Sequence, residues 1–76
     1  MEYDETLDAT GLLCPLPVLK AAKRLRGMKP GATLKMFADD PAAVIDVPHF
    51  CNEQKHELLS SETDGDVQIY VIRRHG

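Results

Sequence analysis

Apolar and polar residues alternate in two early segments, which is the pattern of β-strands that bury one face. The first segment, Tyr3–Ala9, predicts a strand, although Glu5 interrupts its apolar side. The second segment, Ala32–Ala38, predicts a strand whose inner face carries Leu34, Met36 and Ala38.

The end of the chain predicts a β-hairpin. Glu57–Thr63 and Asp66–Arg73 flank an Asp64-Gly65 turn, and Asp-Gly between apolar segments is a strong signal for such a turn. The last segment is apolar on both faces, which indicates a central strand of the sheet.

Between these strands the apolar period becomes helical. A first helix is expected from Pro15 to a Gly27 cap, with an apolar stripe of Val18, Leu19, Ala22 and Leu25. Pro15 and Pro17 fall in its first turn, where backbone N–H groups have no partner within the helix.

A second helical region is expected over Pro41–Lys55, with Asp40 as its N-cap. Pro48 lies inside this region. It predicts a break or kink near Asp46-Val47, with Asp46 capping the longer second piece.

The predicted order of elements is β-α-β-α-β-β. Because crossovers between parallel strands are right-handed, both helices are expected on one face of a four-stranded mixed sheet, an α+β two-layer sandwich. The 76 residues fit a single domain over 1–76. The carboxyl ends of the first two strands and the N-termini of both helices then share one edge, where open α/β sheets bind and react.

Composition and charge argue against a disordered, a membrane-spanning, an exported and a nucleic-acid-binding protein. Apolar residues make up 43% of the chain and charged residues 28%, a globular balance, and no run is long enough for a membrane span. The acidic start, Met1–Glu5, is neither a signal peptide nor a transit peptide, so a cytoplasmic protein is expected. A net charge of −3 argues against bulk electrostatic binding of nucleic acid.

The charges are unevenly distributed along the chain. No acid lies between Leu12 and Ala38, and this stretch holds six of the nine bases: Lys20, Lys23, Arg24, Arg26, Lys29 and Lys35. A solvated helix surface is the ordinary explanation for such a run. The alternative is a basic face for an acidic partner, with Lys20, Lys23 and Arg24 as candidate docking residues.

Two cysteines, Cys14 and Cys51, lie 37 positions apart. Without an export signal both are expected to be free thiols. Neither lies in a C-x-x-C pair, and the three histidines do not complete a four-ligand spacing, so no metal site is predicted.

Cys14 is the candidate reactive residue, because it precedes the proline-started helix. The positive end of the helix dipole is expected to lower the pKa of its thiol from the reference value of about 8.5. Pro15 and Pro17 would stiffen the turn, and the N–H groups of Leu16 and Val18 would remain available to a charged sulfur. Exposed leucines beside it would suit transient docking of another protein, namely Leu12, Leu13 and Leu16. The alternative is a buried cysteine that only packs.

Two further residues are open to more than one interpretation. Cys51 shares an inward-facing helix side with Val47 and Phe50, which favours a buried structural thiol unable to form a disulfide with Cys14. His56 follows the second helix and is either an acid–base group or, more simply, a residue that interacts favourably with the helix dipole.

Several blocks of the chain together resemble one family. Leu12–Leu19 is similar to the C-P-x-P signature of the TusA/SirA-like sulfur carrier family, with Cys14, Pro15 and Pro17 in the motif positions. Later blocks resemble the family in the same order: Asp39–Ala42, Asp46–Cys51, His56–Leu59 and Tyr70–Arg74. The resemblance extends from about Thr6 to Arg74 and is closest to the TusA branch.

The resemblance implies the β-α-β-α-β-β sandwich, similar to the C-terminal domain of translation initiation factor 3. It also implies a cytoplasmic sulfurtransferase that carries sulfane sulfur as a persulfide on Cys14, without a metal or organic cofactor. The donor would be a cysteine desulfurase or a rhodanese-type protein, and the acceptor another protein. One branch leads toward 2-thiolation of the wobble uridine of tRNA; others serve sulfur oxidation, molybdenum cofactor enzymes or sulfur import.

The chain departs from the tRNA-thiolation members at two positions beside the motif cysteine. Those members carry a basic residue where Leu13 stands and an acidic residue where Leu16 stands. The docking surface next to Cys14 therefore differs from theirs, and the choice of partner stays open.

Two other function classes are compatible with the sequence. A non-catalytic interaction or nucleic-acid-binding module would use the basic run and ignore Cys14, although no RNA-binding signature accompanies that run. A thiol-based redox regulator would cycle Cys14 through a disulfide with a partner. For a sulfur carrier, direct binding of nucleic acid or of a membrane is not expected.

Overall fold

Six elements follow one another along the chain. The computed structural model describes residues 3–75, so Met1 and Glu2 of the acidic start, and Gly76, lie outside the described residues. The elements are β1 (Glu5–Asp8), α1 (Leu16–Arg26), β2 (Thr33–Ala38), α2 (Ala43–Gln54), β3 (Glu57–Asp64) and β4 (Val67–Arg73). The predicted order is confirmed, and β1 is shorter than the segment Tyr3–Ala9 suggested by alternation.

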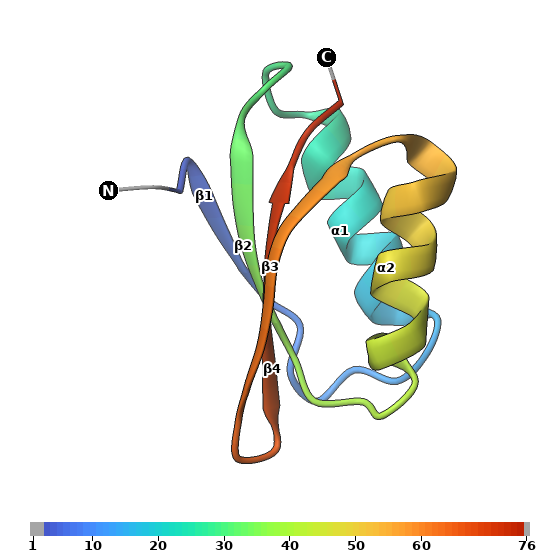
Figure 1. Cartoon of the computed structure of the whole chain (residues 1–76). Helices are drawn as coiled ribbons and strands as arrows, with labels where there is room; N and C mark the ends of the chain where they lie inside the picture. The colour runs from blue at the N-terminus through green and yellow to red at the C-terminus, as the bar shows by residue number, and fades with distance from the viewer. Residues whose placement is uncertain (1–2, 76) are drawn as a thin grey trace.

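The four strands form one mixed sheet in the order β1-β2-β4-β3. β1 runs parallel to β2, whereas β4 pairs antiparallel with both β2 and β3. Both helices cover the same face of this sheet (Figure 1). The two-layer α+β sandwich is therefore confirmed, and so is the central position of β4.

The core lies between the sheet and the two helices. On β2, Leu34, Met36 and Ala38 alternate and are fully buried. Two of their register partners on β4, Ile72 and Tyr70, are buried with them. The period-two pattern read from the sequence therefore identifies the inner face of β2 correctly.

The buried face of α1 differs from the expected stripe. Pro17, Ala21 and Leu25 are buried, at intervals of four residues, whereas Leu19 is 56% exposed. Val18 and Ala22 pack against the edge of the core. The helix is thus rotated from the expected orientation, because its contact with the sheet follows the i, i+4 row that starts at Pro17.

α2 is continuous, contrary to the sequence interpretation. It runs from Ala43 to Gln54 through Pro48, so the expected break near Asp46-Val47 was wrong. Pro48 removes one N–H, which would otherwise bond to the carbonyl four residues earlier. Burial of the inner face of α2 outweighs this loss; its buried residues are Ala43, Val47, Phe50 and Cys51.

The start of α2 also differs from the expectation, because neither Asp40 nor Asp46 is its N-cap. The capping position is held by Ala42, and Asp46 lies in the first turn. Asp40 closes the preceding turn instead. Its carbonyl accepts the N–H of Ala43 at 2.9 Å, and its Oδ1 accepts the N–H of Ala42 at 3.3 Å.

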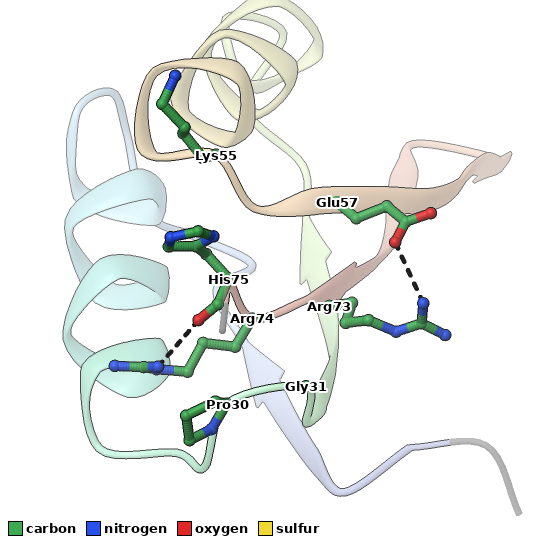
Figure 2. Close-up of a pocket in the computed structure, with 7 residues that line it drawn as sticks. All are labelled: Pro30, Gly31, Lys55, Glu57, Arg73, Arg74 and His75. Carbon is green, nitrogen blue, oxygen red and sulfur yellow. Dashed lines mark hydrogen bonds and ion pairs between the residues drawn. The ribbon is translucent and has the colours of Figure 1, made fainter.

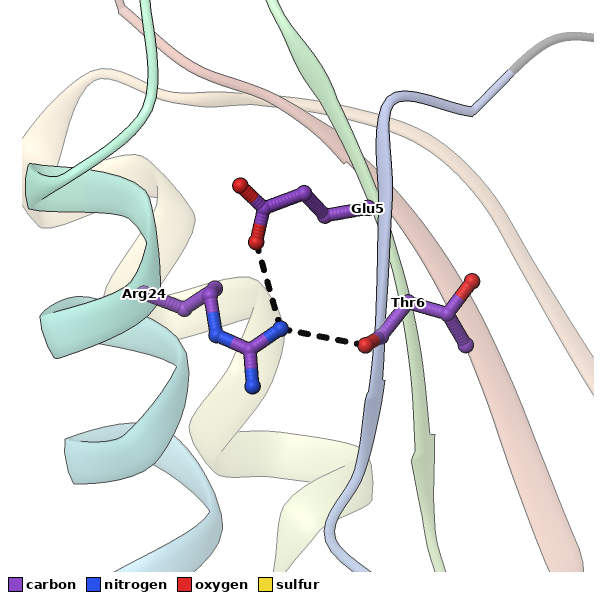
Figure 3. Close-up of polar contacts among 3 residues, drawn as sticks. All are labelled: Glu5, Thr6 and Arg24. Carbon is purple, nitrogen blue, oxygen red and sulfur yellow. Dashed lines mark hydrogen bonds and ion pairs between the residues drawn. The ribbon is translucent and has the colours of Figure 1, made fainter.

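Glu5, the polar residue on the apolar side of β1, has a partner on α1. The guanidinium of Arg24 donates to Glu5 Oε1 at 3.2 Å and to the carbonyl oxygen of Thr6 at 3.1 Å (Figure 3). Both charged side chains are partly exposed, so the ion pair stabilises β1 only modestly. It does fix the direction in which Arg24 points.

The β1–α1 and β2–α2 connections lie at the same end of the molecule (Figure 1). Both helices begin at this end and finish at the opposite end, near the C-terminus of the chain. This is the edge of the sheet that topology marks as the place for a binding or reactive site.

Candidate functional site

Cys14 lies at this edge, in the connection between β1 and α1. It is a free cysteine and is exposed, so the alternative of a buried packing residue does not hold. Pro15 occupies the N-cap of α1 and is joined to Cys14 by a cis peptide bond. Pro17 follows in the first turn of α1 and is buried.

Two neighbouring carboxylates of the β2–α2 connection hold the loop that carries Cys14. Asp40 Oδ2 accepts the backbone N–H of Cys14 at 2.6 Å, and Asp39 Oδ1 accepts the N–H of Gly11 at 2.9 Å. The N–H of Leu16 donates to the carbonyl of Leu13 at 2.8 Å. The expectation that the N–H of Leu16 is available to the sulfur was therefore wrong.

The sulfur of Cys14 faces a carboxylate from the other helix. Its thiol donates a hydrogen bond to Asp46 Oδ2 at 2.7 Å. This bond, together with desolvation and the negative charges of Asp46 and Asp40, raises the pKa of Cys14 above its ordinary value. The expectation of a lowered pKa was wrong, because a carboxylate in direct contact outweighs the modest, short-ranged effect of a helix dipole.

Asp46 is the site residue that sequence reasoning missed. The signal was present, since the topology that brings Cys14 to the end of β1 also brings the first turn of α2 to that edge. Asp46 is the acidic residue of that turn. The sequence analysis makes Asp46 the N-cap of a separate second helical piece, and because α2 is one continuous helix, its side chain is instead directed to Cys14.

A groove of about 340 Å³ runs beside Cys14 between the two helices. Val18 of α1 and Phe50 of α2 supply apolar lining. The polar lining comes from α2 and consists of Asp46, His49, Glu53 and Gln54. Cys14 thus opens onto an acidic groove.

Large apolar side chains are exposed around the same end. Leu13 and Leu16, which flank Cys14 in the chain, are 69% and 46% exposed. Val44 and Ile45, which precede Asp46, are also exposed. Leu12 is the exception to the expectation, because it packs against the core. An apolar surface beside an exposed thiol suits docking of another protein.

The three candidate basic residues lie on the β1 side of α1. Lys20, Lys23 and Arg24 line a wider groove of about 750 Å³ between α1 and β1, together with Leu16 and Leu19. Arg24 is paired with Glu5 there. The structure therefore separates these bases from the acidic groove of Cys14, since the two grooves share no lining residue.

A third concave surface, of about 380 Å³, lies at the opposite end beside residue 75 (Figure 2). Arg73 donates to Glu57 at 3.1 Å, and Arg74 donates through Nε to the carbonyl of Leu25 at 2.6 Å. These contacts fasten β4 to β3 and to the end of α1. The surface is a structural junction remote from Cys14.

His56 belongs to that junction as well. Its Nδ1 accepts the backbone N–H of His75 at 2.8 Å. Burial, and then the charges of Arg74 and His75, lower the pKa of His56. Its position and its partner favour a structural role over acid–base chemistry at the thiol.

Comparison with known proteins shows the family of the chain and a solved structure of similar fold. The family model described as "Sulfurtransferase TusA" matches residues 5–74. The chain belongs to the TusA family. A crystal structure of a SirA-like protein from Desulfitobacterium hafniense is similar in fold, with a TM-score of 0.80 and 23% identity, over 95% of this chain and 99% of that one.

Membership of the TusA family gives the chain a sulfur-carrier role in general, exercised together with partner proteins. Two observations on residues 3–75 complete the description. None of their helices is long and apolar enough to cross a membrane. Nor do three or more of their His, Cys, Asp and Glu side chains gather closely enough to hold a metal ion.

Cys51 of this TusA-family protein is buried and unpaired, as the sequence predicted. Burial raises the pKa of Cys51 to about 11, whereas an unfolded thiol ionises near 8.5. Between these values the unfolded chain releases a proton that the folded chain retains. The contribution of the Cys51 thiol to stability is therefore fully present below about pH 8.5 and is lost as the pH rises toward 11.

We expect the free energy of unfolding to decrease by about 2 kcal/mol between pH 8 and pH 10.5 through Cys51 alone. Urea unfolding of the wild type and of Cys51→Ala at both pH values measures it. Tyr70, whose pKa is also raised by burial, titrates in both proteins and cancels in the comparison. Parallel pH dependence of the two proteins would contradict this explanation.

A buried polar chain connects the centre of the sheet with the Cys14 loop. Tyr70 donates through its hydroxyl to Gln68 Oε1 at 2.6 Å, and Gln68 Nε2 donates to the carbonyl oxygen of Asp40 at 2.9 Å. Asp40 in turn accepts the N–H of Cys14. Gln68 is thus the link between β4 and the connection that anchors the reactive loop.

Gln68→Leu is expected to lower the free energy of unfolding by about 2 kcal/mol, because it leaves the Tyr70 hydroxyl without its acceptor and removes one of the two donors to the Asp40 carbonyl, which keeps only the N–H of Ala43. Urea denaturation measures the loss. Gln54→Leu, at an exposed position of α2, is the matched control and should change stability little. The double variant Gln68→Leu/Tyr70→Phe should recover part of the loss. If the two substitutions instead lowered the free energy of unfolding additively, Tyr70 and Gln68 would not be coupled through their hydrogen bond.

Proposed function

We propose that the chain, as one carrier domain over residues 1–76, holds sulfane sulfur as a persulfide on Cys14 and relays it between two proteins. The observation that carries the proposal is the exposed, free thiol of Cys14 at the shared edge of the two helix starts, flanked by exposed Leu13 and Leu16. Membership of the TusA family supports the class of chemistry.

The relay consists of two balanced exchanges. The Cys14 thiolate attacks the outer sulfur of a donor persulfide; a new S–S bond forms to Cys14 and the donor's S–S bond breaks. The donor sulfur leaves with the bonding electron pair and takes up a proton. An acceptor thiolate then attacks the outer sulfur on Cys14 and regenerates its thiolate. Neither exchange has a net oxidation, so no redox cofactor enters the scheme.

The proposed donor is a cysteine desulfurase or a rhodanese-type protein, and the proposed acceptor is a second sulfur-accepting protein. We place the relay in the cytoplasm, where reducing conditions keep a carrier thiol free. Thiolation of the tRNA wobble uridine is one proposed end point. Leu13 and Leu16 replace the charged pair of the members that serve this pathway, so the partner that docks at Cys14 is expected to present an apolar surface.

Intact-mass spectrometry after incubation with a cysteine desulfurase and cysteine tests the proposal. We expect an adduct of about 32 Da, the mass of one sulfur atom, that reducing agents remove. Peptide mapping should place it on Cys14. A protein that stays unmodified, or one modified only on Cys51, would overturn the proposal. A mixed disulfide with the donor and no added sulfur would favour a redox regulator instead.

A further inference from the structure

The contact between Cys14 and Asp46 joins two segments 32 residues apart in the sequence. The thiol of Cys14 donates to Asp46 Oδ2 at 2.7 Å. On the other side of the residue, Asp40 Oδ2 accepts the backbone N–H of Cys14 at 2.6 Å. Two carboxylates, from α2 and from the connection before it, therefore hold Cys14 by its side chain and by its backbone.

The charged and titratable groups around the sulfur are mostly acidic. α2 contributes Asp46, Glu53 and the titratable His49 to the groove. The β2–α2 connection contributes Asp40 through its bond to Cys14. α1 contributes only Val18 to that lining, because Lys20 and Lys23 line the groove on the β1 side. Ionisation of the thiol would therefore add a negative charge beside those of Asp46 and Asp40, which disfavours the thiolate.

We propose that Asp46 is a positioning residue that holds the Cys14 sulfur as a hydrogen-bonded thiol in the free protein, and that neutralising its carboxylate releases the thiolate. The proposal rests on the proposed function, in which the Cys14 sulfur is the group that reacts. It gives the carrier a resting form in which the exposed thiol is poorly reactive.

Loading would itself undo this contact. In a persulfide, the Cys14 sulfur is bonded to a second sulfur and has no proton left to donate, so the hydrogen bond to Asp46 is lost. The outer sulfur lies about 2 Å further out along the new S–S bond. When that sulfur is ionised, Asp46 and Asp40 repel it toward solvent. The same carboxylates thus restrain the empty carrier and expose the loaded one.

The test is the pH dependence of alkylation of Cys14 by iodoacetamide in the free protein, read from the mass of the Cys14 peptide. Asp46→Asn keeps an oxygen that can accept the thiol proton but removes the charge. We expect the midpoint of its pH–rate profile to lie below that of the wild type. At pH 7 we expect alkylation about threefold faster or more; the gain is limited because a thiolate of lower pKa is a weaker nucleophile.

Glu53→Gln is the matched control, because it removes one negative charge from the same groove and the same helix. Its profile should stay close to that of the wild type, and Asp46→Glu should restore a high midpoint. An Asp46→Asn midpoint equal to that of the wild type would overturn the proposal, and so would an equal shift in Glu53→Gln. Asp46→Ser is a second neutral variant should Asp46→Asn fold poorly.

The two proposals fail separately in this design. Alkylation needs neither a partner nor sulfur, so it reports on Asp46 alone. Loading of the wild type with inorganic polysulfide, followed by intact mass, reports on Cys14 as the sulfur-bearing residue. A shifted alkylation profile without any added sulfur would sustain the role of Asp46 and refute the persulfide. Sulfur uptake on Cys14 with an unshifted alkylation profile would support the persulfide and refute the role of Asp46.

Discussion

The Cys14→Ser variant is expected to take up no sulfur from a cysteine desulfurase, while it unfolds at the same urea concentration as the wild type. A serine hydroxyl cannot form the S–S bond on which the carrier depends. It can still donate to Asp46, which now accepts the thiol at 2.7 Å. Because Cys14 is exposed, the substitution leaves no cavity in the core, and stability should change by less than about 0.5 kcal/mol.

The control for this experiment is the second cysteine. Cys51→Ala should load sulfur like the wild type, since Cys51 is 2% exposed and a donor persulfide cannot reach it. Intact mass after identical incubations compares the three proteins. Sulfur retained by Cys14→Ser, or lost in Cys51→Ala with the fold intact, would transfer the carrier role away from Cys14.

Most of the fold could be predicted from local patterns. Alternation along Ala32–Ala38 identified the inner face of β2, and the two apolar faces of the last strand identified its central place. The errors arose where tertiary packing overrides local preference. α2 continues through Pro48 because its buried side holds it against the sheet. α1 is rotated so that Leu19 is exposed, and no single-helix pattern determines that rotation.

The candidate site could be predicted in position but not in electrostatics. The sequence placed Cys14 at the shared edge, and the structure exposes it there. The dipole of the helix that follows Cys14 predicts a lowered pKa of the thiol, but it is not the dominant influence on the sulfur. The contact that matters comes from Asp46 on α2, and it forms only when both helix starts meet at one end of the sheet.

The same edge carries an apolar surface whose removal should separate protein docking from chemistry. The double variant Leu13→Gln/Leu16→Gln is expected to slow sulfur transfer from a protein donor by about tenfold or more, since each exposed leucine loses apolar area that docking would bury. Both substitutions are uncharged, so they leave the electrostatics around Asp46 and Cys14 unchanged. Single-turnover transfer from a loaded desulfurase, measured by intact mass, gives the rate.

Two comparisons make this result specific to docking. Loading of the double variant from inorganic polysulfide should match the wild type, because a small donor needs no apolar surface. Leu59→Gln, at an exposed leucine of β3 away from the helix starts, should transfer at the wild-type rate. If Leu59→Gln slowed transfer as much, the apolar surface beside Cys14 would have no special part. If the double variant also loaded poorly from polysulfide, the leucines would act on the sulfur itself rather than on the partner.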